Sequence, residues 1–417
     1  MPQISLVSKN FQYPDQVELQ AALSRGAWEQ WKRVLAEKIP PAAIIEEVKA
    51  AKLRGQGGAG FPTGVKWGFV PKDSPKPKYL CVNADEGEPG TFKDRAILEN
   101  DPHLMLEGVA ITCYAVGIHT AFVYMRGEFY QPQRVMEKAI REATEAGLLG
   151  KNIQGSGFDL DVIVHMGAGA YICGEETALL NSLEGWKGWP RLKPPFPAVV
   201  GAFGCPTVIN NVETMAGVPH IMRLGAAEFQ KLGTEKDGGT KLFAISGHVA
   251  KPGVYEMTMG SSLKELIYDV AGGLPGGRRL KAVIPGGSSA PVLKADEIDV
   301  PLEFEAMAAA GTMLGSGAVI VLDETVSIPE VFMVTARFYA HESCGQCTQC
   351  REGCTWIYKI SKKILAGHGQ PSDLDLMLDL ADNMNGKTVC PLGAAMALPT
   401  IGFLKKFPHE FLALMKS

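Results

Sequence analysis

The middle of the sequence alternates between segments of two kinds. Three short apolar segments are typical of β-strands: residues 78–84, 120–126 and 159–165. Three other stretches carry apolar residues at helical spacing: residues 102–117, 132–146 and 174–184. Parallel strands need a long crossover connection, which is usually a helix. The alternation therefore predicts an α/β fold with an at least partly parallel sheet.

The sequence pattern divides the chain into four units. Residues 1–54 are predicted to form a helical segment, and residues 55–236 the α/β domain. Residues 237–326 have the order strand, strand, helix, strand, strand, which resembles a small β-grasp domain. Residues 327–417 are helical and contain a cysteine cluster. Within the α/β domain, the Trp-, Gly- and Pro-rich residues 184–206 are expected to form a long ordered loop.

Charge and hydropathy argue against two classes of partner. The chain has 417 residues, with 41 Lys and Arg against 45 Asp and Glu, a net charge of −4. Sequence-independent binding to nucleic acid needs a basic face, which this balance disfavours. The N-terminal residues lack the apolar core of a signal peptide. No stretch offers the roughly 20 predominantly apolar residues of a membrane helix, so we expect any membrane association to come through a partner.

Five of the nine cysteines lie between residues 344 and 390. In a chain without an export signal, such crowding favours metal ligation over disulfides. Cys344, Cys347 and Cys350 form a Cys-x2-Cys-x2-Cys run, which can surround one face of a [4Fe–4S] cluster and needs a fourth ligand. A four-cysteine zinc site is the alternative, although zinc prefers two Cys-x2-Cys pairs.

Two cysteines are candidates for the fourth ligand. Cys354 completes a run like that of bacterial ferredoxins, but in those proteins the fourth cysteine serves a second cluster and precedes a proline. Here Thr355 follows Cys354, and no second run exists. Cys390 comes from a separate segment and is followed by Pro391. The spacing favours Cys390, with Cys354 as a half-buried structural thiol.

A glycine-rich loop with five glycines spans residues 55–64. Glycines let backbone N–H groups crowd around an anion. A helix starting near Thr63 would add its positive end, and Lys66 can bring a point charge to a phosphate. The segment before the loop is helical rather than a strand, which disfavours the ordinary dinucleotide fingerprint. A flexible linker between helices is the alternative.

Three polar segments follow predicted strands or loops: residues 83–90, 167–177 and 210–214. The first contains three carboxylates, which could accept hydrogen bonds from ribose hydroxyls, or could form a solvated acidic turn. The other two could be plain helix caps. Because open α/β sheets bind ligands at the carboxyl ends of their strands, these segments and the glycine loop together suggest one composite pocket.

Six motifs in this order carry a family resemblance: the glycine loop and residues 83–90, 167–179, 191–197, 210–214 and 342–351. The chain closely resembles the NADH-binding flavoprotein subunit of bacterial respiratory complex I, NADH:quinone oxidoreductase, over essentially its whole length. The resemblance implies a Rossmann-like domain for FMN and NADH, a β-grasp (ubiquitin-like) domain, and a C-terminal helical bundle with one [4Fe–4S] cluster.

The resemblance also implies site residues. FMN contacts fall on Gly55, Gly57, Gly58, Lys66, Asn83, Asp85, Tyr171, Gly174, Glu175, Asn210, Asn211 and Thr214. NADH contacts fall on Phe61, Phe69, Glu86, Glu88, Glu176, Lys193 and Phe196, with the aromatic rings stacking on adenine. The cluster ligands fall on Cys344, Cys347, Cys350 and Cys390. The family usually has Arg in place of Gln56 and Ser in place of Gly87, which puts in doubt an electrostatic role of residue 56 near the flavin phosphate.

The implied function is electron input into complex I. Hydride passes from NADH to FMN, and single electrons pass through the cluster to a small [2Fe–2S] subunit and a large multi-cluster subunit. No side chain needs to act as acid or base. The implied location is the cytoplasmic face of the inner membrane. The diaphorase subunit of an NAD-linked hydrogenase or formate dehydrogenase is the alternative, and a non-enzymatic β-grasp binding module would leave the motifs unexplained.

Overall fold

The structure, a computed structural model, describes residues 5–415. Its first sheet has four parallel strands in the order β3-β2-β1-β4. These strands are β1 (Tyr79–Ala84), β2 (Thr120–Met125), β3 (Asp161–Met166) and β4 (Thr207–Asn211). The predicted α/β fold with a parallel, Rossmann-like sheet is confirmed.

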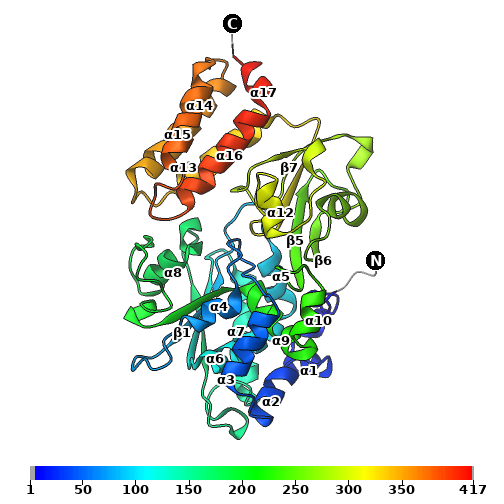
Figure 1. Cartoon of the computed structure of the whole chain (residues 1–417), viewed down its shortest axis with the longest axis vertical. Coiled ribbons are helices and arrows are strands. Elements are labelled where there is room, and N and C mark those ends of the chain that lie inside the picture. The colour runs from blue at the N-terminus through cyan, green and yellow to red at the C-terminus, as the bar shows by residue number, and fades with distance from the viewer. Residues whose placement is uncertain (1–4, 416–417) are drawn as a thin grey trace.

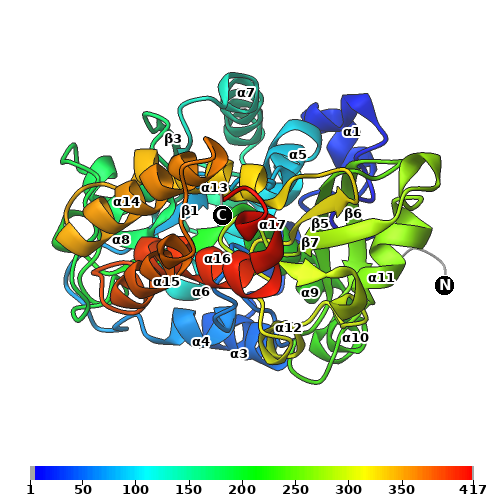
Figure 2. The same cartoon turned by 90° about the horizontal axis from the view of Figure 1, so that it is seen from above.

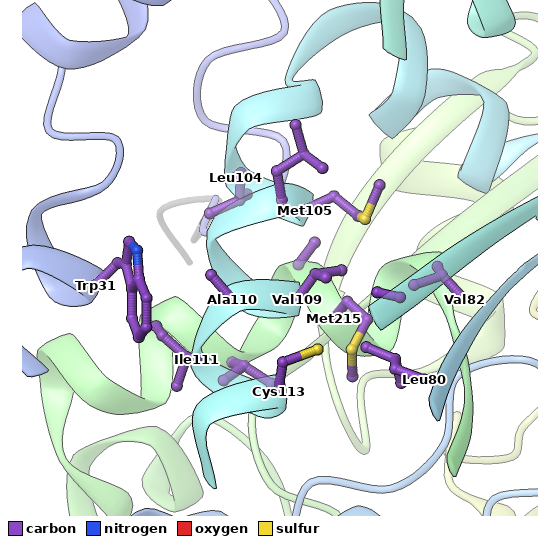
Figure 3. Close-up of a cluster of buried hydrophobic side chains, with 14 of the residues drawn as sticks. Trp31, Leu80, Val82, Leu104, Met105, Val109, Ala110, Ile111, Cys113 and Met215 are labelled. Atoms are coloured by element: carbon purple, nitrogen blue, oxygen red, sulfur yellow. The ribbon is translucent and has the colours of Figure 1, made fainter. Parts of the chain in front are cut away.

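Helices pack around this sheet: α5 (Lys93–Asn100), α6 (Pro102–Val116), α7 (Tyr130–Glu145), α8 (Glu176–Leu183), α9 (Val212–Leu224) and α10 (Ala226–Lys231). Helix α6 is buried along almost its whole length. Figure 3 shows its side chains between Trp31 on one side and Leu80 and Val82 of β1 on the other. A Cβ at Gly108 would lie 1.9 Å from the Met215 carbonyl oxygen, so only glycine lets α6 approach α9 this closely.

Three elements of this domain were missed by the sequence prediction: helices α5 and α10 and strand β4. Helix α9 begins at Val212, within the residues 210–214 that were expected to start a helix. Asn211 links β4 to α9, because it is the last residue of β4 and its side chain accepts the Glu213 N–H as the N-cap of α9.

The N-terminal residues are helical, as predicted, although residues 1–4 lie outside the described part. A short 3₁₀ helix, Pro14–Val17, precedes α1 (Leu19–Ser24), α2 (Glu29–Ala36) and α3 (Pro41–Ala50). Helix α4 (Thr63–Gly68) then begins at the residue expected for the helix after the glycine loop. Short 3₁₀ turns also occur at Ile153–Gly155, Tyr171–Gly174 and Ala202–Gly204.

The second sheet is mixed and has the strand order β6-β5-β9-β7-β8. Its strands are β5 (Thr240–Gly247), β6 (Gly253–Thr258), β7 (Leu280–Ile284), β8 (Leu293–Lys294) and β9 (Ala318–Asp323). Strands β5 and β9 pair in parallel, and the other pairs are antiparallel. Helix α11 (Leu263–Glu265) continues into a π-helical turn, Leu266–Val270. Between β7 and β9 lie two elements that the predicted order of strand, strand, helix, strand, strand did not include, strand β8 and helix α12 (Phe304–Ala309).

The C-terminal part is helical, as predicted. It consists of α13 (Ile328–Glu342), α14 (Thr348–Leu365), α15 (Ser372–Met384), α16 (Leu392–Lys406) and α17 (Pro408–Leu412). Figures 1 and 2 show these helices at one end of the molecule, next to both sheets. Among residues 5–415 we find no helix with the length and apolar character needed to cross a bilayer.

Candidate cofactor-binding site

The glycine-rich loop lies against the carboxyl end of β4. The Gln56 N–H donates to Thr214 Oγ1 at 2.9 Å. From helix α4, Trp67 Nε1 donates to Asn210 Oδ1 at 3.0 Å, and Lys66 Nζ donates to the Ile209 carbonyl oxygen at 3.1 Å. The structure therefore brings the glycine loop and the Asn210–Thr214 segment together, as the composite pocket requires.

Two positions show why this loop is built from glycine. Gly58 has a φ of +126°, a backbone conformation that residues other than glycine rarely adopt. A Cβ at Gly57 would lie 3.2 Å from Asn211 Cβ, tighter than an ordinary contact. The backbone of the loop thus comes close to the polar segment after β4, and the alternative of an unconstrained linker is not supported.

The carboxyl end of β1 supplies a second wall. Asn83 Nδ2 donates to the Gly174 carbonyl oxygen at 2.8 Å, and a Cβ at Gly174 would lie 3.2 Å from the Asp85 carbonyl oxygen. Burial raises the pKa of Asp85 to about 7, although the charge of Arg126 opposes this. Asp85 Oδ2 is buried and has no hydrogen-bond partner among residues 5–415. It is therefore free to bind a polar group of a ligand.

The other two carboxylates of the acidic turn already have partners in the protein. Glu86 accepts hydrogen bonds from two backbone N–H groups in the first turn of α5, at 2.7 and 3.0 Å. Glu88 accepts from Tyr171 Oη at 2.7 Å and from the Ser289 N–H at 2.8 Å. The interpretation of this segment as a solvated acidic turn is wrong.

Acidic residues and a lysine meet at the start of α8. The Glu175 side chain caps this helix by accepting two backbone N–H groups. Lys193, from the Pro-rich loop, lies 3.2 Å from Glu175 and 2.8 Å from Glu176. Burial lowers the pKa of Lys66, and the charges of Glu176 and Lys193 also act on it. Residues expected to bind FMN and residues expected to bind NADH therefore interact electrostatically here.

Three aromatic rings expected to contact NADH are open to solvent. Phe61, Phe69 and Phe196 are 42%, 55% and 58% exposed. The rings of Phe61 and Phe69 have centroids 6.0 Å apart. Exposed rings are available to stack on a planar ligand.

Sequence reasoning missed a set of buried charges beneath the glycine loop. Lys93 Nζ lies 2.7 Å from Asp94 Oδ1 and 2.8 Å from Glu213 Oε2, and all three side chains are at most 4% exposed. Lys241 Nζ, from β5 of the second sheet, donates to the carbonyl and side-chain oxygens of Gln56 at 3.1 and 3.0 Å. A cation thus lies beside residue 56 although that residue is uncharged. A single charged residue in a sequence gives no signal of such burial.

The cysteine cluster lies between the C-terminal helices. Cys344 and Cys347 belong to the loop from α13 to α14, Cys350 lies in the first turn of α14, and Cys390 precedes α16. Cys354 is completely buried rather than half-buried, with its sulfur 3.9 Å from Met384 Sδ.

The spacing of the thiols bears on the choice between zinc and iron–sulfur. Within residues 5–415, no three of these sulfurs lie mutually within 4.8 Å. A tetrahedral zinc site with Zn–S bonds of about 2.3 Å places its sulfurs about 3.8 Å apart. Among the described residues the thiols are therefore not gathered as a single zinc ion would need them.

The α/β domain contacts the cysteine loop at two points. The Tyr171 N–H donates to Glu342 Oε2 at 3.1 Å, and the Tyr171 ring lies edge-on to Phe338 with centroids 5.1 Å apart. Trp189 Nε1 donates to the Cys344 carbonyl oxygen at 3.1 Å. The segment after β3 and the cysteine-bearing segment are therefore in direct contact.

Three family models match successive parts of the chain. Residues 48–220 match the Nuo51 FMN-binding domain, residues 241–321 the SLBB domain, and residues 330–414 the NADH-ubiquinone oxidoreductase-F iron-sulfur binding region. An F subunit of the NADH-quinone oxidoreductase of Rhizobium meliloti, the one numbered 2, is 52% identical over 97% of this chain and 96% of its own length. The chain belongs to the family of NADH-quinone oxidoreductase F subunits.

Other F subunits are similar to this chain to the same degree. That of Rickettsia felis is 50% identical over 94% of this chain and 93% of its own length, and that of Streptomyces coelicolor is 52% identical over 92% and 85%. Among solved structures, an NAD⁺-reducing [NiFe]-hydrogenase in the H2-reduced state is 35% identical, with a TM-score of 0.83. The match covers 99% of this chain and 65% of the hydrogenase chain, so this chain spans about two thirds of that chain's length.

The residues present fit the cofactors of the F-subunit family. The glycine cradle, the open Asp85 Oδ2 and the buried cation at Lys241 suit a polar, phosphate-bearing ligand. Thr63 Oγ1, at the start of α4, is a second buried oxygen without a hydrogen-bond partner in the described chain. Four cysteines from two segments supply the thiolates that a [4Fe–4S] cluster needs.

Proposed function

We propose that this chain is the electron-input subunit of an NADH:quinone oxidoreductase, and that it takes hydride from NADH onto FMN and passes single electrons to a [4Fe–4S] cluster. FMN supplies the conversion between two-electron and one-electron transfer. The observation that carries the proposal is the hydrogen bond from Tyr171 to Glu342, because it joins a proposed FMN-binding residue to the last residue of α13, directly before the cysteine loop.

The glycine loop and two strand ends are proposed to hold FMN. Backbone N–H groups of the loop and the Lys66 ammonium would bind the phosphate, since both place positive charge at an anion. Asp85 would bind a polar group through its open oxygen. The full proposed set is Gly55, Gly57, Gly58, Lys66, Asn83, Asp85, Tyr171, Gly174, Glu175, Asn210, Asn211 and Thr214.

The exposed aromatic rings are proposed to bind NADH together with charged groups around α8. Glu86 and Glu88 already accept hydrogen bonds from the protein, so they would meet the nucleotide through their remaining lone pairs. Lys193 would be held in place by Glu175 and Glu176. The full proposed set is Phe61, Phe69, Glu86, Glu88, Glu176, Lys193 and Phe196.

The cluster ligands are proposed to be Cys344, Cys347, Cys350 and Cys390. The proposed domains are a helical segment at 1–54, the FMN and NADH domain at 55–236, a β-grasp domain at 237–326 and the cluster domain at 327–417. The parallel pairing of the first and last strands of the second sheet, β5 and β9, at its centre supports the β-grasp assignment.

Electrons are proposed to leave through the cluster to a small [2Fe–2S] subunit and a large multi-cluster subunit of the same complex. These partners would attach the chain to the membrane-bound complex on the cytoplasmic face of the inner membrane. Cys344, Cys347 and Cys390 are only partly buried, which supports an exit at this surface.

A second candidate is the diaphorase subunit of an NAD-linked hydrogenase. The 35% identical chain of the NAD⁺-reducing [NiFe]-hydrogenase supports it. The higher identity to F subunits, 50–52% over nearly their full length, favours complex I. Co-purification separates the two, because a tagged chain should recover either quinone-reducing iron–sulfur subunits or a nickel-containing partner.

The enzymatic proposal is tested by an anaerobic visible and EPR spectrum of the purified holoprotein, before and after addition of NADH. We expect a flavin absorption band that bleaches and a reduced [4Fe–4S] signal that appears. A colourless protein that contains zinc and does not respond to NADH would overturn the proposal.

A further inference from the structure

The cysteine sulfurs differ in the groups that donate hydrogen bonds to them. Among the four proposed ligands, the Cys347 sulfur accepts from the Val389 N–H at 3.4 Å. The Cys350 sulfur lies 3.3 Å from the hydroxyl oxygen of Ser343. The Ser343 hydroxyl can therefore donate a hydrogen bond to one of these sulfurs, and a substitution of Ser343 removes this donor.

Ser343 is held in place for this contact. It caps the C-terminal end of α13, and its N–H donates to the Tyr339 carbonyl oxygen at 3.0 Å. Cys350 is only 6% exposed. A hydrogen bond at a buried sulfur acts in a low local dielectric, where its electrostatic effect is larger than in water.

We propose that the Ser343 hydroxyl donates a hydrogen bond to the Cys350 sulfur when that sulfur binds iron, and thereby raises the reduction potential of the cluster. The inference rests on the proposed ligand set. An iron-bound thiolate carries no proton, so the hydroxyl must be the donor in this pair. The Ser343 hydroxyl would stabilise the additional negative charge of a reduced cluster without losing its own proton. Ser343 is a positioning residue for electron transfer rather than a ligand.

The test is a potentiometric titration followed by EPR, on the full chain with its cluster. Ser343→Ala should lower the midpoint potential by about 59 mV, which is a tenfold change in the equilibrium constant of a one-electron couple. Ser343→Thr keeps the hydroxyl and should keep a potential close to that of the wild type. Ser327→Ala, at the other end of α13, is the matched control, because Ser327 makes no capping hydrogen bond within the described chain.

The outcomes separate this inference from the proposed function. If Ser343→Ala keeps its iron and EPR signal and its midpoint potential is unchanged from the wild type, the role of Ser343 is refuted while the ligand set stands. If the wild-type chain holds no cluster, the proposed function fails first. If Ser343→Ala loses iron, the midpoint potentials of Ser343→Val and Ser343→Thr are compared instead. These two side chains have the same shape, and only threonine has a hydroxyl. A lower potential in the valine variant supports the proposal, and equal potentials overturn it.

Discussion

Removing the negative charge of Glu213 should strongly destabilise the α/β domain. Burial opposes ionisation of Glu213, but the charges of Lys241 and Lys93 outweigh it and hold the pKa of this carboxyl below its usual value. Glu213 Oε2 lies 2.8 Å from Lys93 Nζ and 3.5 Å from Lys241 Nζ, and Oε1 accepts the Leu242 N–H at 2.6 Å. In Glu213→Gln the amide oxygen can still accept from Leu242, but both ammonium groups lose their shared counter-charge.

The magnitude follows from the fate of the two lysines. Breaking a buried ion pair by removing one partner costs about 3–5 kcal/mol. Lys93 keeps Asp94 at 2.7 Å but loses its 2.8 Å contact with Glu213, so the two lysines share the cost. Burial already lowers the pKa of Lys241 to about 8 against the charge of Glu213. Without Glu213 this lysine can lose its proton at neutral pH. Because its wild-type pKa is about 8, this limits the share of the cost that falls on Lys241 to about 1.4 kcal/mol at pH 7.

The assay is thermal unfolding of the holoprotein, with Glu228→Gln as control because that residue forms an exposed pair with Lys231. At roughly 2–4 °C per kcal/mol for a domain of this size, the midpoint of Glu213→Gln should fall by about 6–20 °C. The control should change by no more than the loss of a surface pair, about 0.5 kcal/mol.

The pH dependence gives a sharper check on the same variant. In the wild type Lys241 stays protonated up to about pH 8. In Glu213→Gln the neutral lysine makes the folded state bind fewer protons than the unfolded state already at pH 7. The difference in the free energy of unfolding between wild type and Glu213→Gln should therefore decrease by about 1.4 kcal/mol from pH 7 to pH 8 and then stay constant. A gap that is small at pH 7, or that stays constant to pH 8, would refute the reasoning. Adding Lys241→Met should recover part of the lost stability, because it removes the unpaired charge.

Three further predictions concern other parts of the chain. Cys390→Ser should lose cluster iron while Cys354→Ser keeps it, as measured by iron analysis per chain, and equal losses would contradict the ligand set. Burial raises the pKa of Glu107 from 4.5 to about 7, so its stabilising effect is complete below pH 4.5 and is lost as the pH rises through 7. In chemical denaturation, the free energy of unfolding of the wild type should fall by about 3 kcal/mol between about pH 5 and pH 8 relative to Glu107→Gln, which cannot ionise. If the two proteins show the same dependence of unfolding free energy on pH, this prediction is wrong. Trp67→Phe leaves Asn210 Oδ1 without its 3.0 Å donor, so it should cost about 1–3 kcal/mol in thermal unfolding and weaken FMN binding. An unchanged unfolding midpoint would show that this hydrogen bond is not stabilising.

The regular elements could be predicted where periodicity was strong. Strands β1, β2 and β3 and helices α6, α7 and α8 lie within two residues of their predicted bounds. Strand β4 was missed because it is short and ends in Asn210 and Asn211, and asparagine is depleted in strands. In the fold the Asn210 side chain accepts from Trp67 of α4 and the Asn211 side chain accepts at the start of α9. The residues that obscure the strand in the sequence are therefore among those of the candidate site.

The buried charges could not be predicted from the sequence. Lysine and glutamate are almost always exposed unless they are paired. Glu213 and Lys241 are distant in the sequence, and their pairing depends on β5 of the second sheet lying against α9. Sequence patterns identify which segments face a core, but the position of one domain on another is set by contacts that no local pattern encodes. For the same reason the motif containing Glu342 and Ser343 was assigned to the cluster alone, without its contact to the α/β domain.

That contact explains how one chain can keep two proposed redox sites at a fixed separation. Tyr171 is held at both ends, because its N–H donates to Glu342 and its hydroxyl donates to Glu88. The same 3₁₀ turn ends at Gly174, whose carbonyl oxygen accepts from Asn83 at the end of β1. A turn fixed at these three points cannot move relative to the sheet without also moving the start of the cysteine loop. Rigid attachment at this junction, rather than any acid or base, is what the fold contributes to electron transfer between the two sites.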